Sequence, residues 1–278
     1  MKNLDLELCP ERSAFLAGQF EEMYRCYNRI EFVDPDPVSV VREFPLLPDR
    51  EVAGLIASSL AYGRASMIVR SARLVLGMMG KNPYAFVLGA SDDHIRVLCE
   101  GFRHRFTDQQ DLFDLIVSIR NGLTGFGSIE NVFASGLNCS GERVLGGLMR
   151  LSDVLRKASG NRKNSLLPDP SLGSACKRYH LFLKWMVRQD QIDPGGWSCI
   201  GPDELLIPMD THMHRICSEL GLVKRKAADL GSVLEATGSF RKICPRDPAR
   251  YDFALTRFGI RPDLKIVDLI GQCTDINV

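Results

Sequence analysis

An aspartate separates an apolar run from an amphipathic segment in the stretch LLIPMDTHMHRICSELGL at 205–222. Four apolar residues of this segment share one helical face, namely Met213, Ile216, Cys217 and Leu220. Pro208 prevents this helix from extending backwards, which places Asp210 at or next to its N-cap. There a carboxylate accepts backbone N–H bonds and lies at the positive end of the helix dipole. Capping alone accounts for an aspartate at this position, but such a group at the edge of a buried face can also stabilise positive charge on a substrate.

A basic segment precedes this aspartate. From Glu142 to Arg188 the chain holds ten Lys or Arg against three Asp or Glu, although the net charge of the whole chain is only +1. Helical projection of ACKRYHLFLKWMVR at 175–188 places Lys177, Lys184 and Arg188 opposite the apolar side chains. Such a face is most often merely solvated. Close to Asp210, however, we interpret Lys184 and Arg188 as contacts to DNA phosphates, together with the loop residues Arg162 and Lys163.

Composition limits the class of protein. With 278 residues and 45% hydrophobic content, the chain can form one large domain or two intimate lobes. No segment approaches the roughly 20 apolar residues of a membrane span, and MKNLDLELCPERS has no signal-peptide pattern. We therefore expect a cytoplasmic protein with no membrane partner, and the predicted DNA contacts imply association with the nucleoid. The nine cysteines form no CxxC pair, which indicates reduced thiols without a disulfide framework, and no metal or cofactor is expected.

The elements that must position these groups are predicted to be helices. Helical spacing of apolar residues occurs in eight stretches, at 16–27, 50–62, 66–79, 111–121, 143–157, 175–188, 211–220 and 249–258. No convincing alternating strand and no glycine-rich nucleotide-binding motif is present. We therefore predict an all-α fold, with linkers at 34–37, near 135–141 and at 159–174.

The quoted residues also carry a resemblance to a known family. IPMDTHMHRICSELGL resembles the segment of the helix-hairpin-helix DNA glycosylase superfamily in which an aspartate opens the helix after the hairpin. From KRYHLFLKWMVR to DPARYDFALTRFGI, the chain is similar to a bacterial branch related to archaeal 8-oxoguanine DNA glycosylases. In the first half, EVAGLIASSLAYGRASMIVRSA resembles more weakly the early helix whose end lines the base pocket of that superfamily.

The resemblance implies roles for individual residues. Asp210 corresponds to the catalytic aspartate, and Lys177 matches the lysine arrangement of the archaeal enzymes better than Lys184 does. Further residues are assigned to a base pocket or to DNA contacts. The base-pocket residues are Tyr62, Arg64, Trp185 and Trp197, and the additional DNA contact is His212. For each aromatic residue, core packing is the competing interpretation.

The chain also departs from that superfamily. Its hairpin motif is missing, and DPGGW at 193–197 is the nearest glycine pair that could grip a phosphate through backbone N–H groups. The cysteine tail that binds an iron–sulfur cluster is absent, because Cys273 stands alone near the C-terminus. An iron–sulfur cluster is therefore not expected.

Together, the site residues, the basic segment and the resemblance predict a DNA repair glycosylase that excises a damaged base from double-stranded DNA. The resemblance favours an oxidised purine such as 8-oxoguanine, while uracil and alkylated purines stay open. If the amine of Lys177 attacks C1′ of the sugar, an AP lyase activity accompanies base release; if not, Asp210 activates water. The expected monomer has a middle lobe at 49–174 and a second lobe formed by 1–48 with 175–278, with the DNA cleft between them.

Two other functions compete with this reading. Asp210 and His214 are helical neighbours, so with His212 they could belong to a metal-dependent phosphohydrolase. Against that alternative, His212 and His214 are two residues apart and project to different faces of a helix. The second alternative is a non-catalytic DNA-binding protein of the same fold.

Overall fold

The computed structural model of the chain describes residues 8–139, 141–158 and 162–274. Within these ranges the protein is all-α, because helices account for all of the regular structure apart from isolated bridges. None of the helices in the described ranges is both long enough and apolar enough to cross a lipid bilayer. The predictions for residues 1–7 and for the start of the 159–174 linker lie outside the described residues.

Fourteen α-helices follow one another in the described residues. The α-helices are α1 (Pro10–Tyr27), α2 (Val38–Val41), α3 (Leu47–Ser59), α4 (Ala65–Met79), α5 (Pro83–Gly89), α6 (Asp92–Cys99), α7 (Gln109–Phe126), α8 (Ile129–Ala134), α9 (Arg143–Ala158), α10 (Lys177–Val187), α11 (Thr211–Glu219), α12 (Leu230–Ile243), α13 (Asp252–Ile260) and α14 (Ile266–Thr274). Short 3-10 turns are η1 (Ile30–Phe32), η2 (Pro170–Leu172) and η3 (Pro202–Glu204).

The all-α prediction is confirmed, and each of the eight predicted helical stretches overlaps a helix of the structure. Several helices were not predicted, namely α2, α5, α6, α8, α12 and α14. All but α12 and α14 have eight residues or fewer, which is less than the window of about 11–18 residues in which apolar spacing identifies a helix. The longest of them, α12, contains Gly231 and Gly238, which lower helix propensity.

The chain divides into two compact units. Unit 1 comprises residues 1–32, 173–180 and 201–278, and unit 2 comprises 33–172 and 181–200. Residues 33–48 and 181–200 therefore cluster with the middle of the chain, whereas the predicted lobes assign them to the other part. The lobes and the DNA cleft between them stay a prediction.

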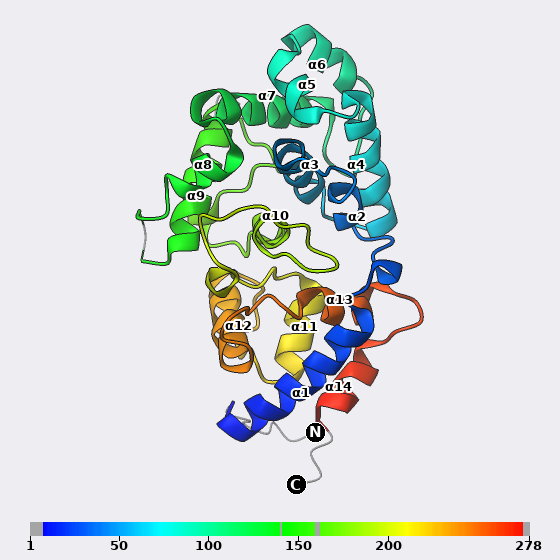
Figure 1. Cartoon of the computed structure of the whole chain (residues 1–278), viewed down its shortest axis with the longest axis vertical. Coiled ribbons are helices and arrows are strands. Elements are labelled where there is room, and N and C mark those ends of the chain that lie inside the picture. Colours follow the sequence, from blue (N-terminus) through cyan, green and yellow to red (C-terminus); the bar gives the residue numbers. More distant parts are fainter. Residues whose placement is uncertain (1–7, 140, 159–161, 275–278) are drawn as a thin grey trace. The chain divides into compact units, whose positions relative to one another are not determined.

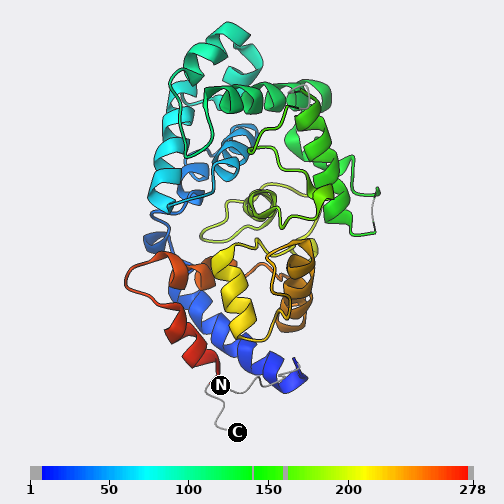
Figure 2. The same ribbon diagram turned by 180° about the vertical axis from the view of Figure 1, so that it is seen from behind.

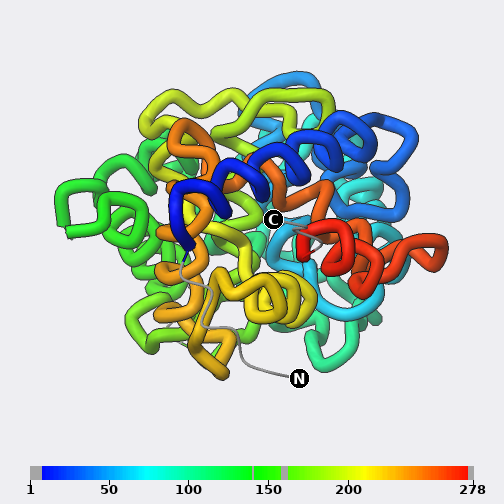
Figure 3. Tube along the Cα trace, turned by 90° about the horizontal axis from the view of Figure 1, so that it is seen from below, coloured from blue at the N-terminus to red at the C-terminus, as the bar shows by residue number. Residues whose placement is uncertain are grey.

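Unit 1 is organised around α1, which packs against α12, α13 and α14 (Figures 1 and 3). Aromatic side chains occupy this contact: Phe20 stacks on Phe240 with ring centroids 5.8 Å apart, and Tyr251 lies 5.6 Å from Phe20. Helix α11 packs against α13 and α14, so its apolar face is buried. This packing fixes the N-terminus of α11, where Asp210 lies.

Unit 2 contains α2 to α9 and most of α10. Helix α7 packs against α5, α6, α8 and α9, and α2, α4 and α5 pack against α3 (Figures 1 and 2). The side chains of Phe182 and Met186 on α10 reach the backbone of α3 at Gly54, where an added Cβ would lie 3.0 Å from the Met186 methyl group. Helix α10 is therefore a core element over most of its length, and only its first turn belongs to unit 1.

Candidate active site

Asp210 caps α11 as its position after Pro208 predicts. Its backbone is extended, and its Oδ1 accepts hydrogen bonds from the backbone N–H groups of His212 and Met213, both at 2.9 Å. The capping prediction is confirmed. Because Oδ1 makes both capping bonds, Oδ2 is the oxygen that can interact outside the helix.

Lys177 is the first residue of α10, and the segment before it is tied to α12. The backbone N–H of Leu230 donates to the carbonyl of Gly173, and Ser174 forms a bridge with Asp229, the N-cap of α12. Cys176, directly before the helix, has a φ of +40°, so the chain turns sharply into α10 at this point. Both the segment that carries Lys177 and helix α11 lie in unit 1.

The structure brings Lys177 and Asp210 together. The Nζ atom of Lys177 lies 3.5 Å from Oδ2 of Asp210, and the two side chains are 28% and 26% exposed. An amine and a carboxylate thus meet at the N-termini of two helices, partly shielded but within reach of a ligand. In such a pair the carboxylate can take a proton from the amine or stabilise positive charge beside it.

His180, one helical turn after Lys177, marks the transition to a buried environment. Burial lowers the pKa of its imidazole to about 4. Neither ring nitrogen has a hydrogen-bond partner among the described residues. His180 is therefore neutral near pH 7.

The two histidines after Asp210 go to different places. His212 is exposed, and its ring lies over Gly259 of α13, where an added Cβ would come within 2.7 Å of the ring. His214 Nε2 lies 3.0 Å from the carbonyl oxygen of Arg225, a hydrogen bond within unit 1. No group of three or more metal-ligating side chains occurs in the part of the chain that the structure describes.

The prediction that Lys184 and Arg188 line an exposed basic face is wrong. Both side chains are buried, and both pair with Asp193, a carboxylate with no exposed surface. Lys184 Nζ lies 3.5 Å from Asp193 Oδ1, and Arg188 bonds to Oδ2. Burial raises the pKa of Asp193 to about 6, and the two cations oppose that rise. The helical projection failed because the partner lies beyond the helix, in the following loop.

The aromatic residues Trp185 and Trp197 are not pocket residues either, because both are buried in the core of unit 2. The indole N–H of Trp197 donates to Glu51 Oε1 at 2.8 Å, and its ring lies edge-on to Phe182 with centroids 5.2 Å apart. Burial raises the pKa of Glu51, while hydrogen bonds from the backbone of α8 and from Trp197 oppose the rise. Core packing, the competing interpretation, holds for both tryptophans.

The glycine pair at 195–196 bonds within unit 2. The N–H of Gly195 donates to the carbonyl of Trp185, and the N–H of Trp197 donates to that of Met186. Both glycines have positive φ angles, +65° at Gly195 and +127° at Gly196. An added Cβ at Gly196 would also lie 2.6 Å from a methyl group of Leu47. Both positions therefore require glycine. These contacts explain the glycines by chain folding, without a phosphate.

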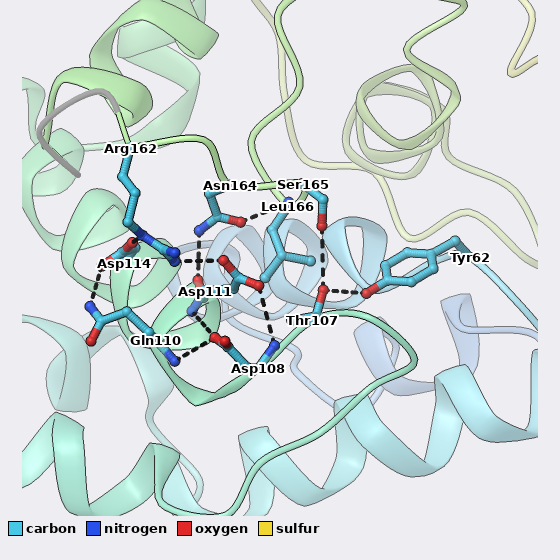
Figure 4. Close-up of polar contacts among 10 residues, drawn as sticks. All are labelled: Tyr62, Thr107, Asp108, Gln110, Asp111, Asp114, Arg162, Asn164, Ser165 and Leu166. Carbon is cyan, nitrogen blue, oxygen red and sulfur yellow. Dashed lines mark hydrogen bonds and ion pairs between the residues drawn. The ribbon is translucent and has the colours of Figure 1, made fainter.

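Arg162 and Tyr62 take part in polar networks of unit 2 (Figure 4). The guanidinium of Arg162 bridges two carboxylates at the start of α7, with Nε 2.7 Å from Asp114 and Nη2 2.5 Å from Asp111. The hydroxyl of Tyr62 donates to the carbonyl of His104 at 3.1 Å and contacts Thr107. Arg162 therefore has a structural role whether or not it also contacts DNA.

Lys163 and Arg64 are exposed, as a contact to a partner requires. The sequence did not single out Phe106, which is 66% exposed and stacks on Tyr62 with centroids 4.9 Å apart and an interplanar angle of 19°. The one available signal was the run Arg-His-Arg-Phe at 103–106, in which basic and aromatic residues alternate.

Comparison with known proteins shows the family of this chain. Residues 36–261 match the model of the family described as Protein of unknown function (DUF2400), and the chain belongs to that family. Neither a curated protein nor a solved structure matches it.

The family match corrects the resemblance drawn from the sequence. The chain was identified as similar to helix-hairpin-helix DNA glycosylases, but the family whose model it matches has no known function, and no glycosylase family matches. The resemblance rested mainly on an aspartate at a helix start, and capping of α11 is sufficient to explain that residue.

Proposed function

We propose that this protein is a DNA N-glycosylase in which Asp210 and Lys177 act on the sugar of a damaged nucleotide. The observation that carries the proposal is the 3.5 Å separation of Lys177 Nζ and Asp210 Oδ2, with both side chains about one-quarter exposed. Cleavage of an N-glycosidic bond builds positive charge on the sugar. A carboxylate held in place by two backbone N–H groups can stabilise that charge without reorganising.

The position of Lys177 favours a covalent route. Asp210 takes a proton from the Lys177 ammonium, and the neutral amine attacks C1′ while the bond to the base breaks and its electron pair leaves with the base. The base gains a proton. Opening of the sugar ring then gives an iminium ion between Nζ and C1′, which allows β-elimination of the 3′ phosphate before water releases the lysine.

Double-stranded DNA with a damaged base is the proposed partner, bound by a monomer in the cytoplasm in association with the nucleoid. Reaching C1′ in a duplex requires the nucleotide to be extruded, and the protein must hold the backbone while this occurs. Exposed cations outside the pair, such as Lys163, suit that task. An oxidised purine such as 8-oxoguanine is the first lesion to test.

The test combines base release with covalent trapping. Purified protein is incubated with duplexes that contain 8-oxoguanine, uracil or an alkylated purine, with and without borohydride. We expect wild type to form a borohydride-trapped protein–DNA adduct and Lys177→Gln to form none. Lys242→Gln, an exposed lysine of α12 in the same unit, is the matched control and should trap as wild type does.

The outcomes separate the mechanisms. Base release without an adduct would mean that Asp210 activates water and that Lys177 only contacts DNA. Absence of base release from every lesion would overturn the proposal. Activity that a chelator abolishes would favour a metal-dependent hydrolase instead.

A further inference from the structure

A tight turn of unit 2 presents an aromatic ring and a guanidinium at its tip. His104 and Thr107 exchange two backbone hydrogen bonds, each 3.0 Å long, so Arg105 and Phe106 form a two-residue loop between them. A two-residue loop of this kind places both residues at the tip of the turn. Both are exposed, and Arg103, just before the turn, is exposed as well.

The base of the turn is anchored by buried polar contacts. His104 Nδ1 lies 2.9 Å from the hydroxyl of Ser71, and its Nε2 lies 3.1 Å from the carbonyl oxygen of Tyr62. The hydroxyl of Tyr62 in turn donates to the carbonyl of His104. The same hydroxyl contacts that of Thr107 (Figure 4). These contacts fix the base of the turn, although the two residues at its tip are exposed.

The ring of Phe106 is presented as a flat surface. It stacks on Tyr62 at 4.9 Å, and Tyr62 in turn is fixed through its hydroxyl and lies edge-on to His104 at 4.7 Å. The Phe106 side chain is 66% exposed and therefore contributes little to the core. Its stacking on Tyr62 instead fixes the orientation of the ring. One aromatic face can then receive another ring.

The backbone at Arg105, at the tip of the turn, is strained. Arg105 has a φ of +55°, a conformation that favours glycine at the first position of a two-residue loop. Its side chain lies over Gly63, where an added Cβ would come within 2.9 Å of Arg105 Cδ. Neither Arg105 nor Arg64 forms an ion pair with any described residue. A strained residue whose charge is unpaired points to a ligand that the charge meets.

We propose that Phe106, supported by Tyr62, stacks on an unpaired base of single-stranded DNA while Arg105 and Arg103 contact the adjacent phosphates. Nucleic-acid strands are recognised by aromatic side chains that stack on bases, combined with cations that follow the backbone. The turn supplies both on one short segment. The surface lies in unit 2 and uses neither Lys177 nor Asp210, so this binding does not depend on base excision.

The test compares two strands of equal charge. Equilibrium binding is measured with a fluorescent oligothymidylate of about twelve nucleotides and with an abasic strand of the same length. Wild type should bind the strand with bases more tightly than the abasic strand. Phe106→Ala should bind the strand with bases about tenfold more weakly than wild type does, so that its affinities for the two strands are equal. Leu172→Ala, which also removes an exposed apolar side chain of unit 2, should leave the preference unchanged.

Arg105→Gly separates binding from folding. Glycine removes the strain at φ +55°, so the variant should unfold at the same urea concentration as wild type or at a higher one. It should nevertheless lower the salt dependence of binding by about 0.7 in logarithmic slope, the value for one lost phosphate contact on a single strand. The exposed Arg246→Ala in unit 1 is the control.

Each contrary result overturns a stated part. Equal binding of the two strands by wild type, or a base preference that survives in Phe106→Ala, would remove the stacking surface. An unchanged slope in Arg105→Gly would remove the phosphate contact. All of these measurements use undamaged DNA, so their outcome is distinct from any result on base release.

Discussion

Helix α10 contributes two lysines, and each lies 3.5 Å from an aspartate, yet the two pairs differ in every other respect. The Lys177–Asp210 pair of unit 1 has side chains 28% and 26% exposed, whereas those of Lys184 and Asp193 in unit 2 are 2% and 0% exposed. Distance alone therefore does not identify a functional site. A buried pair is closed to a substrate and serves the fold, and a partly exposed pair can exchange its partner for a ligand.

The partners of the two aspartates support this distinction. Oδ1 of Asp210 accepts the two capping hydrogen bonds of α11, and Oδ2 pairs with Lys177. Asp193 pairs with two buried cations, Lys184 and Arg188, and belongs to a loop that unit 2 holds from several sides. Arg50, for example, donates to the carbonyl of Gly195 at 2.7 Å. The loop around Asp193 is thus built for rigidity.

The largest expected effect comes from breaking the buried pair. Lys184→Met should lower the free energy of unfolding by about 3–5 kcal/mol, because it removes one partner of a fully buried carboxylate. Lys177→Met removes a lysine at the same distance from its aspartate but in a partly exposed pair, and should cost no more than about 1 kcal/mol. Urea unfolding measures both variants. Equal losses would show that burial does not distinguish the pairs.

Exchange of each aspartate for asparagine should separate activity from stability. Asp210→Asn should reduce base excision about 100- to 1,000-fold, because the charge beside the sugar is lost. Its stability should change by less than about 1 kcal/mol, because asparagine caps a helix as well as aspartate does. Asp193→Asn should show the reverse pattern, with lower stability but normal excision per folded molecule. A stable Asp210→Asn variant with wild-type excision would contradict the catalytic role.

The sequence was sufficient for the parts of this comparison that depend on local pattern. The apolar spacing of α11 and the proline before it located Asp210 at or next to the N-cap, and the spacing at 175–188 predicted a helix that begins near Lys177. Helix α12 was missed although Val233, Ala236, Thr237 and Phe240 are buried at helical spacing. Its glycines and polar residues obscured that period.

The sequence could not predict which residues from other segments would cover a polar side chain. Lys184 and Arg188 lie opposite the apolar face of α10 in projection, and a cation there is normally solvated. The loop after the helix covers that second face and brings Asp193 to it. Such a partner is invisible to helical periodicity, because it depends on how the loop folds back.

A pH experiment on His180 should locate where α10 becomes buried. Folding lowers the pKa of His180 from 6.5 to about 4, so below pH 6.5 the unfolded chain binds a proton that the folded chain does not. His180 therefore destabilises the fold increasingly as the pH falls from about 6.5 to 4, by a few kcal/mol in all. His180→Phe should lose less stability than wild type over this interval, as urea unfolding at several pH values will show. A constant difference between the two proteins would place His180 in contact with water.

The smallest effect concerns a third set of charges, whose cation is more exposed and whose carboxylates are less exposed than those of the Lys177–Asp210 pair. The side chain of Arg162 is 43% exposed, while its partners Asp111 and Asp114 are nearly buried. Arg162→Ala should cost about 1 kcal/mol, because water replaces part of the interaction but the carboxylates lose their cation. Lys163→Ala removes the same charge from the neighbouring exposed residue and should change stability by only a few tenths of a kcal/mol. A loss for Arg162→Ala as large as that for Lys184→Met would mean that pairing with two carboxylates outweighs exposure.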